Sequence, residues 1–116
     1  MTKVPFNLLL DTPIEASEPI ASERVVKGLP KAGSLAALTN HEQGFHVGQW
    51  VSDVGAWRVD YSEDELCVIL AGSGRLIGDD GSEFPFKTGS AFVIPRGFQG
   101  IWETFERVRK IYAIAE

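Results

Sequence analysis

Hydrophobic and polar positions alternate strictly from residue 55 to residue 61, which is the period-two pattern of a half-buried β-strand. The members on the apolar side, which we expect to face the interior, are Trp57, Val59 and Tyr61. Turn-type residues at 62–64 then interrupt the alternation. After them Glu65 opens an almost unbroken apolar run that closes at Gly72 and is typical of a strand covered on both faces. Because an unpaired buried carboxylate is expensive, Glu65 predicts either a site residue or a buried ion pair.

Short strands separated by turns recur along the rest of the chain. Residues 91–94 form a second apolar strand, and residues 99–105 form a returning strand with Gly100, Trp102 and Thr104 on one face. Residues 79–82, Asp-Asp-Gly-Ser, predict a hairpin turn between the two segments. The other predicted strands are 22–26, 35–40, 45–51, 75–77, 83–86 and 107–113, although the alanines and leucines of 35–40 also allow a helical turn. Strands every 8–12 residues or so, with no convincing long helix, predict an all-β barrel or sandwich.

The spacing of glycine, proline and one acidic residue in these segments resembles the two motifs of the cupin superfamily. Glu65 and Gly72 have the Glu-to-Gly spacing of the first motif, and Gly89, Pro95 and Gly97 match the second. Further elements resemble the small single-domain cupins similar to (S)-ureidoglycine aminohydrolase and the ethanolamine-utilisation cupins: Gly28-Leu29-Pro30, Gly48-Gln49-Trp50, Gly55-x-Trp57-Arg58-Val59, Glu65-x-Cys67, Trp102-Glu103 and Val108-Arg109-Lys110-x-Tyr112. The resemblance implies a cupin jelly-roll β-barrel, a double-stranded β-helix, over residues 24–116.

The resemblance also implies where the metal ligands of the family fall, and this chain lacks most of them. The two histidine positions of the first motif fall on Arg58 and Asp60, or on Val59 and Tyr61 if the turn is one residue shorter. The third histidine position falls on Gly100. Of the four ligands only Glu65 remains, and one carboxylate without an imidazole does not hold Mn, Fe, Ni or Zn. We therefore expect no metal and no other cofactor.

The family places Glu65 on the inner face of the barrel, and period two then brings Cys67 to the same face. Trp102 shares a face with Gly100 and fills the space beside it, so its buried indole N–H is expected to donate to Glu65. These side chains, with the alternating apolar residues, predict one ligand-binding cavity. The residues expected to line it are Glu65, Tyr61, Cys67, Trp102, Trp57, Val59 and Lys110.

Several of these residues also have a purely structural interpretation. Glu65 alternatively pairs with a basic residue in the barrel wall, the candidates being Arg58, Arg75 and Lys110. Cys67 suits a small packing thiol better than a nucleophile, because no cationic neighbour in the sequence lowers its pKa. Lys110 is either a base with a lowered pKa or a member of an ion pair. His41 and His46 suit surface or cap roles better than joint metal binding, since a strand sends them to opposite faces.

Composition and charge restrict the class of partner. The 116 residues suit one domain, and 11 basic against 16 acidic residues give a net charge of −5, which argues against nucleic-acid and anionic-membrane binding. No apolar run approaches the ~20 residues that span a bilayer. The first residues lack the apolar core and cleavage site of a signal peptide. The single cysteine excludes an internal disulfide and fits the cytoplasm.

Residues 1–23 are acidic and contain three prolines, so they predict an extended arm ahead of the barrel domain. Phe6, Leu8 and Leu10 alternate in it and offer a strand to the sheet edge of this subunit or of a partner, from which we expect a homodimer. Three functions remain open: a metal-independent cupin that binds a small molecule; an enzyme similar to ureidoglycine aminohydrolase or the ethanolamine-utilisation cupins, acting on a small nitrogen compound or a short-chain acid; and a structural dimer with a filled barrel.

Overall fold

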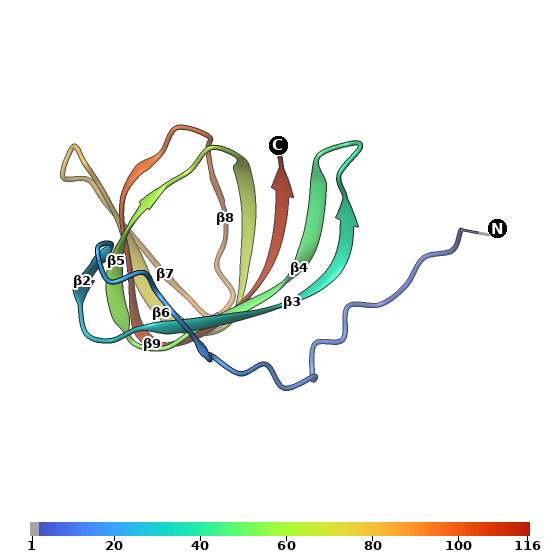
Figure 1. Ribbon diagram of the computed structural model, residues 1–116, viewed down its shortest axis with the longest axis horizontal. Helices are drawn as coiled ribbons and strands as arrows, with labels where there is room; N and C mark the ends of the chain where they lie inside the picture. The colour runs from blue at the N-terminus through green and yellow to red at the C-terminus, as the bar shows by residue number, and fades with distance from the viewer. Residues whose placement is uncertain (1–2) are drawn as a thin grey trace.

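The computed structural model describes residues 3–116, and its regular elements are strands of a single curled antiparallel sheet (Figure 1). The strands are β1 (Glu18–Pro19), β2 (Val25–Lys27), β3 (Lys31–Asn40), β4 (Phe45–Ser52), β5 (Gly55–Asp60), β6 (Asp64–Gly78), β7 (Glu83–Lys87), β8 (Ala91–Ile94) and β9 (Gln99–Ala115). No helix occurs between residues 3 and 116, so the expected all-β barrel is confirmed. Residues 35–40 are strand, as part of β3, rather than a helical turn.

Two long strands close the barrel. β6 pairs with β7, β8 and β9, and β9 pairs with β4, β5 and β6, so each of them contributes to both sides. The separate strands predicted at 65–70 and 75–77 are therefore one bent strand, as are those at 99–105 and 107–113. β6 bends at register shifts around Gly72, where φ is +96° and a Cβ atom would overlap the carbonyl oxygen of Arg107. Only glycine adopts this positive φ without strain and leaves room for the neighbouring backbone.

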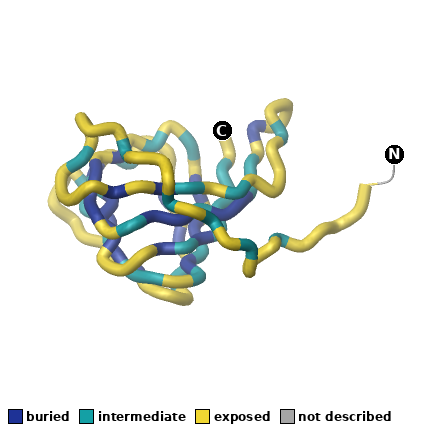
Figure 2. Tube along the Cα trace, turned by 60° about the horizontal axis from the view of Figure 1, so that its bottom comes forward, coloured by how far each residue is buried: buried dark blue, intermediate teal, exposed yellow. Residues whose placement is uncertain are grey.

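One face of the sheet is the barrel interior. In β6 the residues Glu65, Cys67 and Ile69 are buried, whereas Leu66 between them is 43% exposed. The expectation that this strand is covered on both faces is therefore wrong. An antiparallel barrel of a single sheet covers only the inner face of its strands, and Figure 2 shows the buried residues along the strands and the exposed ones on the loops and the arm.

Aromatic rings fill the closed end of the interior. The Phe86 ring centroid lies 4.8 Å from that of Trp102 and 5.4 Å from that of Phe92. The hairpin predicted at 79–82 joins β6 to β7 and carries Phe86 into this cluster. These packed rings close one end of the barrel interior and form the bottom of the space at the other end.

The N-terminal arm runs outside the barrel and then away from it (Figure 1). The Gln49 side-chain amide donates to the carbonyl oxygen of Leu9 at 3.0 Å, and Arg107 donates to that of Ile14 at 2.8 Å. Residues 3–17 form no strand, so the alternating apolar residues at 6–10 do not extend a sheet within this subunit. The first two residues of the predicted arm, Met1 and Thr2, lie outside the described residues. Among residues 3–116 there is no helix of the length and apolarity that crossing a membrane requires.

Candidate functional site

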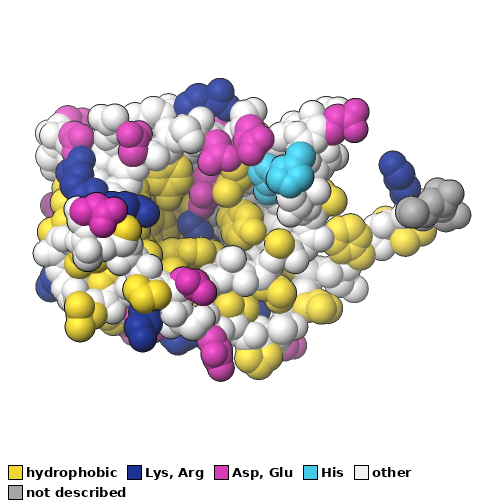
Figure 3. Space-filling view, in the orientation of Figure 1, with side chains coloured by type: hydrophobic (Ala, Val, Ile, Leu, Met, Phe, Trp, Pro, Cys, Tyr) yellow, Lys and Arg dark blue, Asp and Glu magenta, His cyan; other side chains and the backbone are white. Residues whose placement is uncertain are grey.

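The open end of the barrel holds a cavity of about 500 Å³. Strands β3, β4, β5, β6 and β9 supply most of its wall. Figure 3 looks into this hollow, which is walled by hydrophobic side chains and has basic and acidic side chains inside it. Its lining residues are Ile20, Arg24, Ser34, Thr39, His46, Trp50, Trp57, Val59, Tyr61, Glu65, Trp102, Lys110, Tyr112 and Ile114. A cavity in this position argues against the filled barrel.

An ion pair forms the polar centre of the cavity. Lys110 Nζ lies 2.6 Å from Glu65 Oε2, and both side chains are almost completely buried. The same ammonium lies 4.6 Å from the ring centroid of Trp50 and 4.5 Å from that of Trp102. A cation over two indole faces gains attraction from both rings. The Lys110 ammonium therefore occupies the place beside Glu65 where a cation is best stabilised.

Pairing register explains why Lys110, of the three candidate cations, meets Glu65. In the β6–β9 ladder Lys110 lies opposite Ile69, four residues along β6 and on the same inner face as Glu65. Arg58 points out of the barrel and pairs with Asp79 at 2.7 Å, while Arg75 pairs with Glu83 and Glu103. Of the three candidates, Lys110 is therefore the one that lies on the inner face and neutralises the carboxylate.

The pKa of Lys110 is raised, although burial alone would lower it, because neighbouring Cys67, Glu65 and Tyr61 together favour the charged ammonium. Of these neighbours only the Glu65 carboxylate carries a charge at neutral pH. A lysine that serves as a general base needs the opposite shift. The hypothesis that Lys110 is a base with a lowered pKa is therefore wrong, and the ion-pair alternative describes it.

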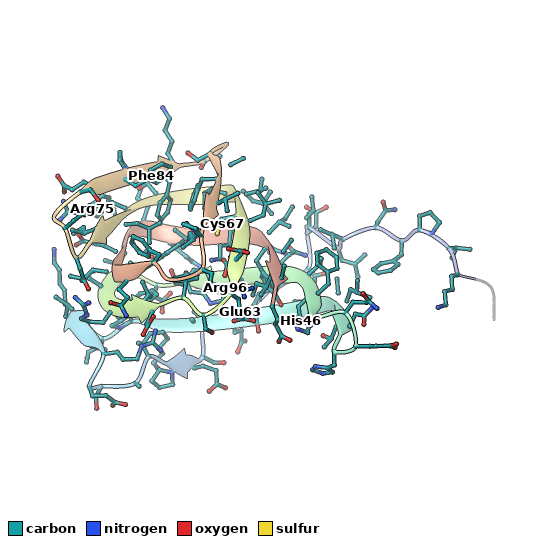
Figure 4. The ribbon with its side chains drawn as sticks, turned by 90° about the horizontal axis from the view of Figure 1, so that it is seen from above. His46, Glu63, Cys67, Arg75, Phe84 and Arg96 are labelled. Atoms are coloured by element: carbon teal, nitrogen blue, oxygen red, sulfur yellow. The ribbon has the colours of Figure 1, made fainter. Side chains whose placement is uncertain are left out.

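Cys67 lies beneath the ion pair rather than in the cavity wall. Its Sγ donates to Glu65 Oε2 at 3.0 Å, and the residue is fully buried. Burial raises the pKa of the thiol to about 12, so it stays protonated at neutral pH and supports Glu65 as a donor. In Figure 4 Cys67 lies on β6 inside the barrel, whereas His46 lies near the β3–β4 hairpin.

Two tyrosines add hydroxyl groups to the wall. Burial raises the pKa of Tyr61 well above its ordinary value, with smaller contributions of both signs from its charged neighbours. The pKa of Tyr112 is also raised, first by burial. The Tyr112 hydroxyl lies across β4, where a Cβ on Gly48 would come within 2.5 Å of it. Gly48 therefore makes room for a cavity residue that the sequence analysis did not single out.

The expected hydrogen bond from Trp102 to Glu65 is wrong. The indole N–H of Trp102 donates to Thr104 Oγ1 at 2.9 Å, and that hydroxyl lies 2.7 Å from Ser52 Oγ. Thr104 lies two residues along the same inner face of β9, so it is the nearer acceptor. The indole instead offers its ring face to Lys110.

The two histidines do not form a metal site with Glu65. His46 lies at the cavity rim, where Nε2 is 3.1 Å from Glu116 Oε1 and the ring centroid is 5.4 Å from that of His41. Within residues 3–116, no three side chains of His, Cys, Asp or Glu gather closely enough to hold a metal. At the third histidine position of the family, a Cβ on Gly100 would overlap the carbonyl oxygen of Ile77. An imidazole at residue 100 therefore has no room unless the backbone moves.

Several cavity residues were not predicted from the sequence. Trp50, Tyr112 and Ile114 line the cavity. Tyr112 and Ile114 lie two and four residues after Lys110 in β9, so the alternation of a strand places them on the same inner face and could have identified them. Arg24 at the mouth has no such signal, because it precedes β2 and is held by a 3.0 Å bond from Nε to the carbonyl oxygen of Arg58.

The curled sheet and its open, polar-centred cavity define a small cupin. Residues 39–112 match the family model described as the EutQ-like cupin domain, and the chain belongs to that family. No curated protein matches the chain.

Solved structures agree with the fold. A Pseudomonas syringae protein of unknown function superposes with a TM-score of 0.82 at 22% identity, over 93% of this chain and 46% of that one. This chain thus spans less than half of that protein. EutQ of Clostridium difficile gives a TM-score of 0.73 at 17% identity over 92% of this chain and 82% of that chain. The putative ethanolamine utilisation protein EutQ of Salmonella typhimurium gives a TM-score of 0.66 at 21% identity, over 73% of this chain and 69% of that chain.

Proposed function

We propose that this cupin binds a small molecule in its barrel cavity without a metal ion. The observation that carries the proposal is the Lys110 ammonium 2.6 Å from Glu65 Oε2, at the one metal-ligand position that the chain retains. A divalent cation beside Glu65 would have to displace a buried ammonium that also interacts with two indole rings. The missing histidine positions and the blocked position of Gly100 support the same conclusion.

The cavity favours a ligand with an apolar body and one polar head. Its volume of about 500 Å³ falls in the range of small-molecule sites. Between residues 3 and 116, Glu65 Oε2 receives the bonds from Lys110 and Cys67, while no side-chain bond reaches Oε1. The hydroxyl groups of Tyr61 and Tyr112 are likewise free of side-chain bonds within that range. An amide-like head, which donates through its N–H to Glu65 and accepts through its carbonyl oxygen from a tyrosine, suits these groups.

Catalysis by the side chains of the cavity is the second candidate and is less favoured. The pKa values of Tyr61, Cys67 and Lys110 are all raised, so none of them is a base or a nucleophile at neutral pH. Structural likeness at the identities found supports the fold and not an activity. We further propose a cytoplasmic location, because a single buried thiol suits a reducing compartment.

A thermal-shift screen of the purified protein tests binding. The screen uses amides, amines and short-chain acids with aliphatic or aromatic bodies. We expect at least one to stabilise the protein, by about 2.7 kcal/mol at a concentration 100 times its Kd. Tyr61→Phe is expected to weaken that binding by about 0.5–1.5 kcal/mol, because a single neutral hydrogen bond is lost.

Ser73→Ala is the matched control, since its hydroxyl bonds Glu106 and does not line the cavity. It should leave the affinity unchanged. Consumption of a stabilising compound, seen by mass spectrometry, would favour the enzyme instead. The absence of any shift across the screen would count against a binding role.

A further inference from the structure

A second hollow of the barrel lies in the corner between β7 and β8. Both strands pair with the same edge of β6, β7 along residues 73–77 and β8 along residues 65–68, while β9 occupies the other edge. β6 bends around Gly72 between the two pairings, so the inner faces of β7 and β8 are turned toward each other. The ring centroids of Phe84 in β7 and Phe92 in β8 lie 5.1 Å apart. Among residues 3–116 neither strand pairs with a further strand, and the corner therefore stays open at its outer side.

The corner contains a cavity of about 170 Å³, which shares no lining residue with the cavity around Glu65, called the main cavity from here on. Three phenylalanine side chains line it, Phe84, Phe92 and Phe98, together with aliphatic residues of β6 and β8. Phe98 lies between the two cavities, since the centroid of its ring is 6.3 Å from that of Tyr61 in the wall of the main cavity. The corner is therefore separate from the site described above.

Phe84 shows that the corner is incompletely packed. It lies on the same face of β7 as Phe86, two residues further along the strand. Phe86 is buried in the core, whereas Phe84 is 49% exposed, at the edge of the barrel in Figure 4. An aromatic ring on an inner face that keeps half of its surface open leaves apolar area for a ligand to cover, and covering such area is favourable.

The corner offers no polar group to a ligand. Ser82 is the one polar side chain in the lining that residues 3–116 supply, and its hydroxyl donates to Asp80 Oδ1 at 2.6 Å. The same lining includes no acidic, basic or histidine side chain. A charged group that entered would lose its hydration without compensation. The corner therefore favours an uncharged, apolar molecule.

We propose that the corner binds a small uncharged aromatic molecule with a single ring. An apolar cavity of about 150 Å³ stays free of water and holds one benzene molecule, and the corner has a similar volume. Its three phenylalanine rings offer the offset and edge-to-face contacts that aromatic pairs prefer. The space is too small for a helix of another protein, which is about 10 Å across.

Titration of the full-length protein with benzene, followed by nuclear magnetic resonance, tests the proposal. We expect the backbone amide signals of residues 84, 92–94 and 98 to shift as benzene is added. The three tryptophans of the chain all line the main cavity, so their indole N–H signals report whether benzene enters there instead. Benzoate and benzylammonium carry a charge on the same ring and should bind the corner at least about 10-fold more weakly than benzene.

Two variants of the corner and one matched control locate the site. Phe84→Ala removes one of the three rings and should weaken benzene binding about 10-fold. Ser82→Leu removes no packed ring and fills the corner with an aliphatic side chain from an exposed turn residue, so it should abolish the shifts. Phe105→Ala is the control, because Phe105 is 47% exposed in β9 and does not line the corner. It should bind benzene as the wild type does.

Loss of the shifts in both corner variants, with their retention in Phe105→Ala, would support the proposal. Wild-type affinity in Phe84→Ala and Ser82→Leu would overturn it, and so would the absence of corner shifts up to the solubility limit of benzene. Shifts confined to the indole signals would place benzene in the main cavity alone. Corner signals that change with protein concentration rather than with benzene would show that a second chain fills the corner. Each of these two results would also overturn the proposal.

Discussion

Replacement of Lys110 by methionine is expected to lower the free energy of unfolding by about 3–5 kcal/mol, because the Glu65 carboxylate then remains buried without its counter-charge. The side chains of the pair are 6% and 9% exposed, so little water reaches the orphaned charge. Among residues 3–116, the side-chain donor that remains for it is the Cys67 thiol. Glu65→Gln should lower the stability in the same direction, since it leaves a buried ammonium.

The double variant Glu65→Gln/Lys110→Met separates the pair from general damage to the barrel. It removes both charges, so much of the loss should be recovered. Lys27→Met is the control: Lys27 also approaches a buried carboxylate, Glu103 at 3.4 Å, but its side chain is 72% exposed, and its contribution is about 0–1 kcal/mol. Urea denaturation of the wild type and of the four variants gives these values. Equal losses in the double and single variants would show that the ion pair is not the source of the effect.

Restoring histidine at the third ligand position of the family, by Gly100→His, is expected to destabilise the protein by about 3 kcal/mol and to create no metal site. The Cβ atom would overlap the backbone carbonyl oxygen of Ile77 across the β6–β9 ladder. Overpacking costs about 1–3 kcal/mol of stability, and the cost lies near the upper end of that range when the clash is with backbone, which cannot rotate away. The imidazole would also find Lys110, rather than a metal, beside Glu65.

Gln99→His is the control for this variant, since residue 99 is the exposed neighbour in the same strand. A surface substitution of this kind changes the stability by about 0.5 kcal/mol or less. Denaturation with and without added zinc compares the two proteins. A Gly100→His protein as stable as wild type, or one that zinc stabilises, would show that the position is open to a ligand.

The sequence predicted the barrel and much of its inner face because both depend on local spacing. Strict alternation at 57–61 is enough to place Trp57, Val59 and Tyr61 on one side of β5 and its end, where the cavity lies. Period two likewise placed Glu65 and Cys67 together. These inferences need no knowledge of what packs opposite.

The partners of these residues could not be predicted in the same way. Glu65 had three candidate cations, and only the pairing of β6 with β9 selects Lys110. The sequence predicted that Trp102 donates to Glu65 on another strand. Its indole N–H instead donates to the hydroxyl of Thr104, which lies two residues away on the same face. The continuity of β6 through Gly72 was missed because a glycine that bends a strand and one that ends it look alike in a sequence.

Elemental analysis of the purified full-length protein tests most directly whether Lys110 stands in place of a metal. Lys110 and Glu65 already neutralise one another within hydrogen-bond distance, so we expect no stoichiometric transition metal and no change of melting temperature with a chelator. Within residues 3–116, no cluster of three His, Cys, Asp or Glu side chains adds further ligands to Glu65. One equivalent of Mn, Fe, Ni or Zn that Glu65→Gln removes would contradict the proposal.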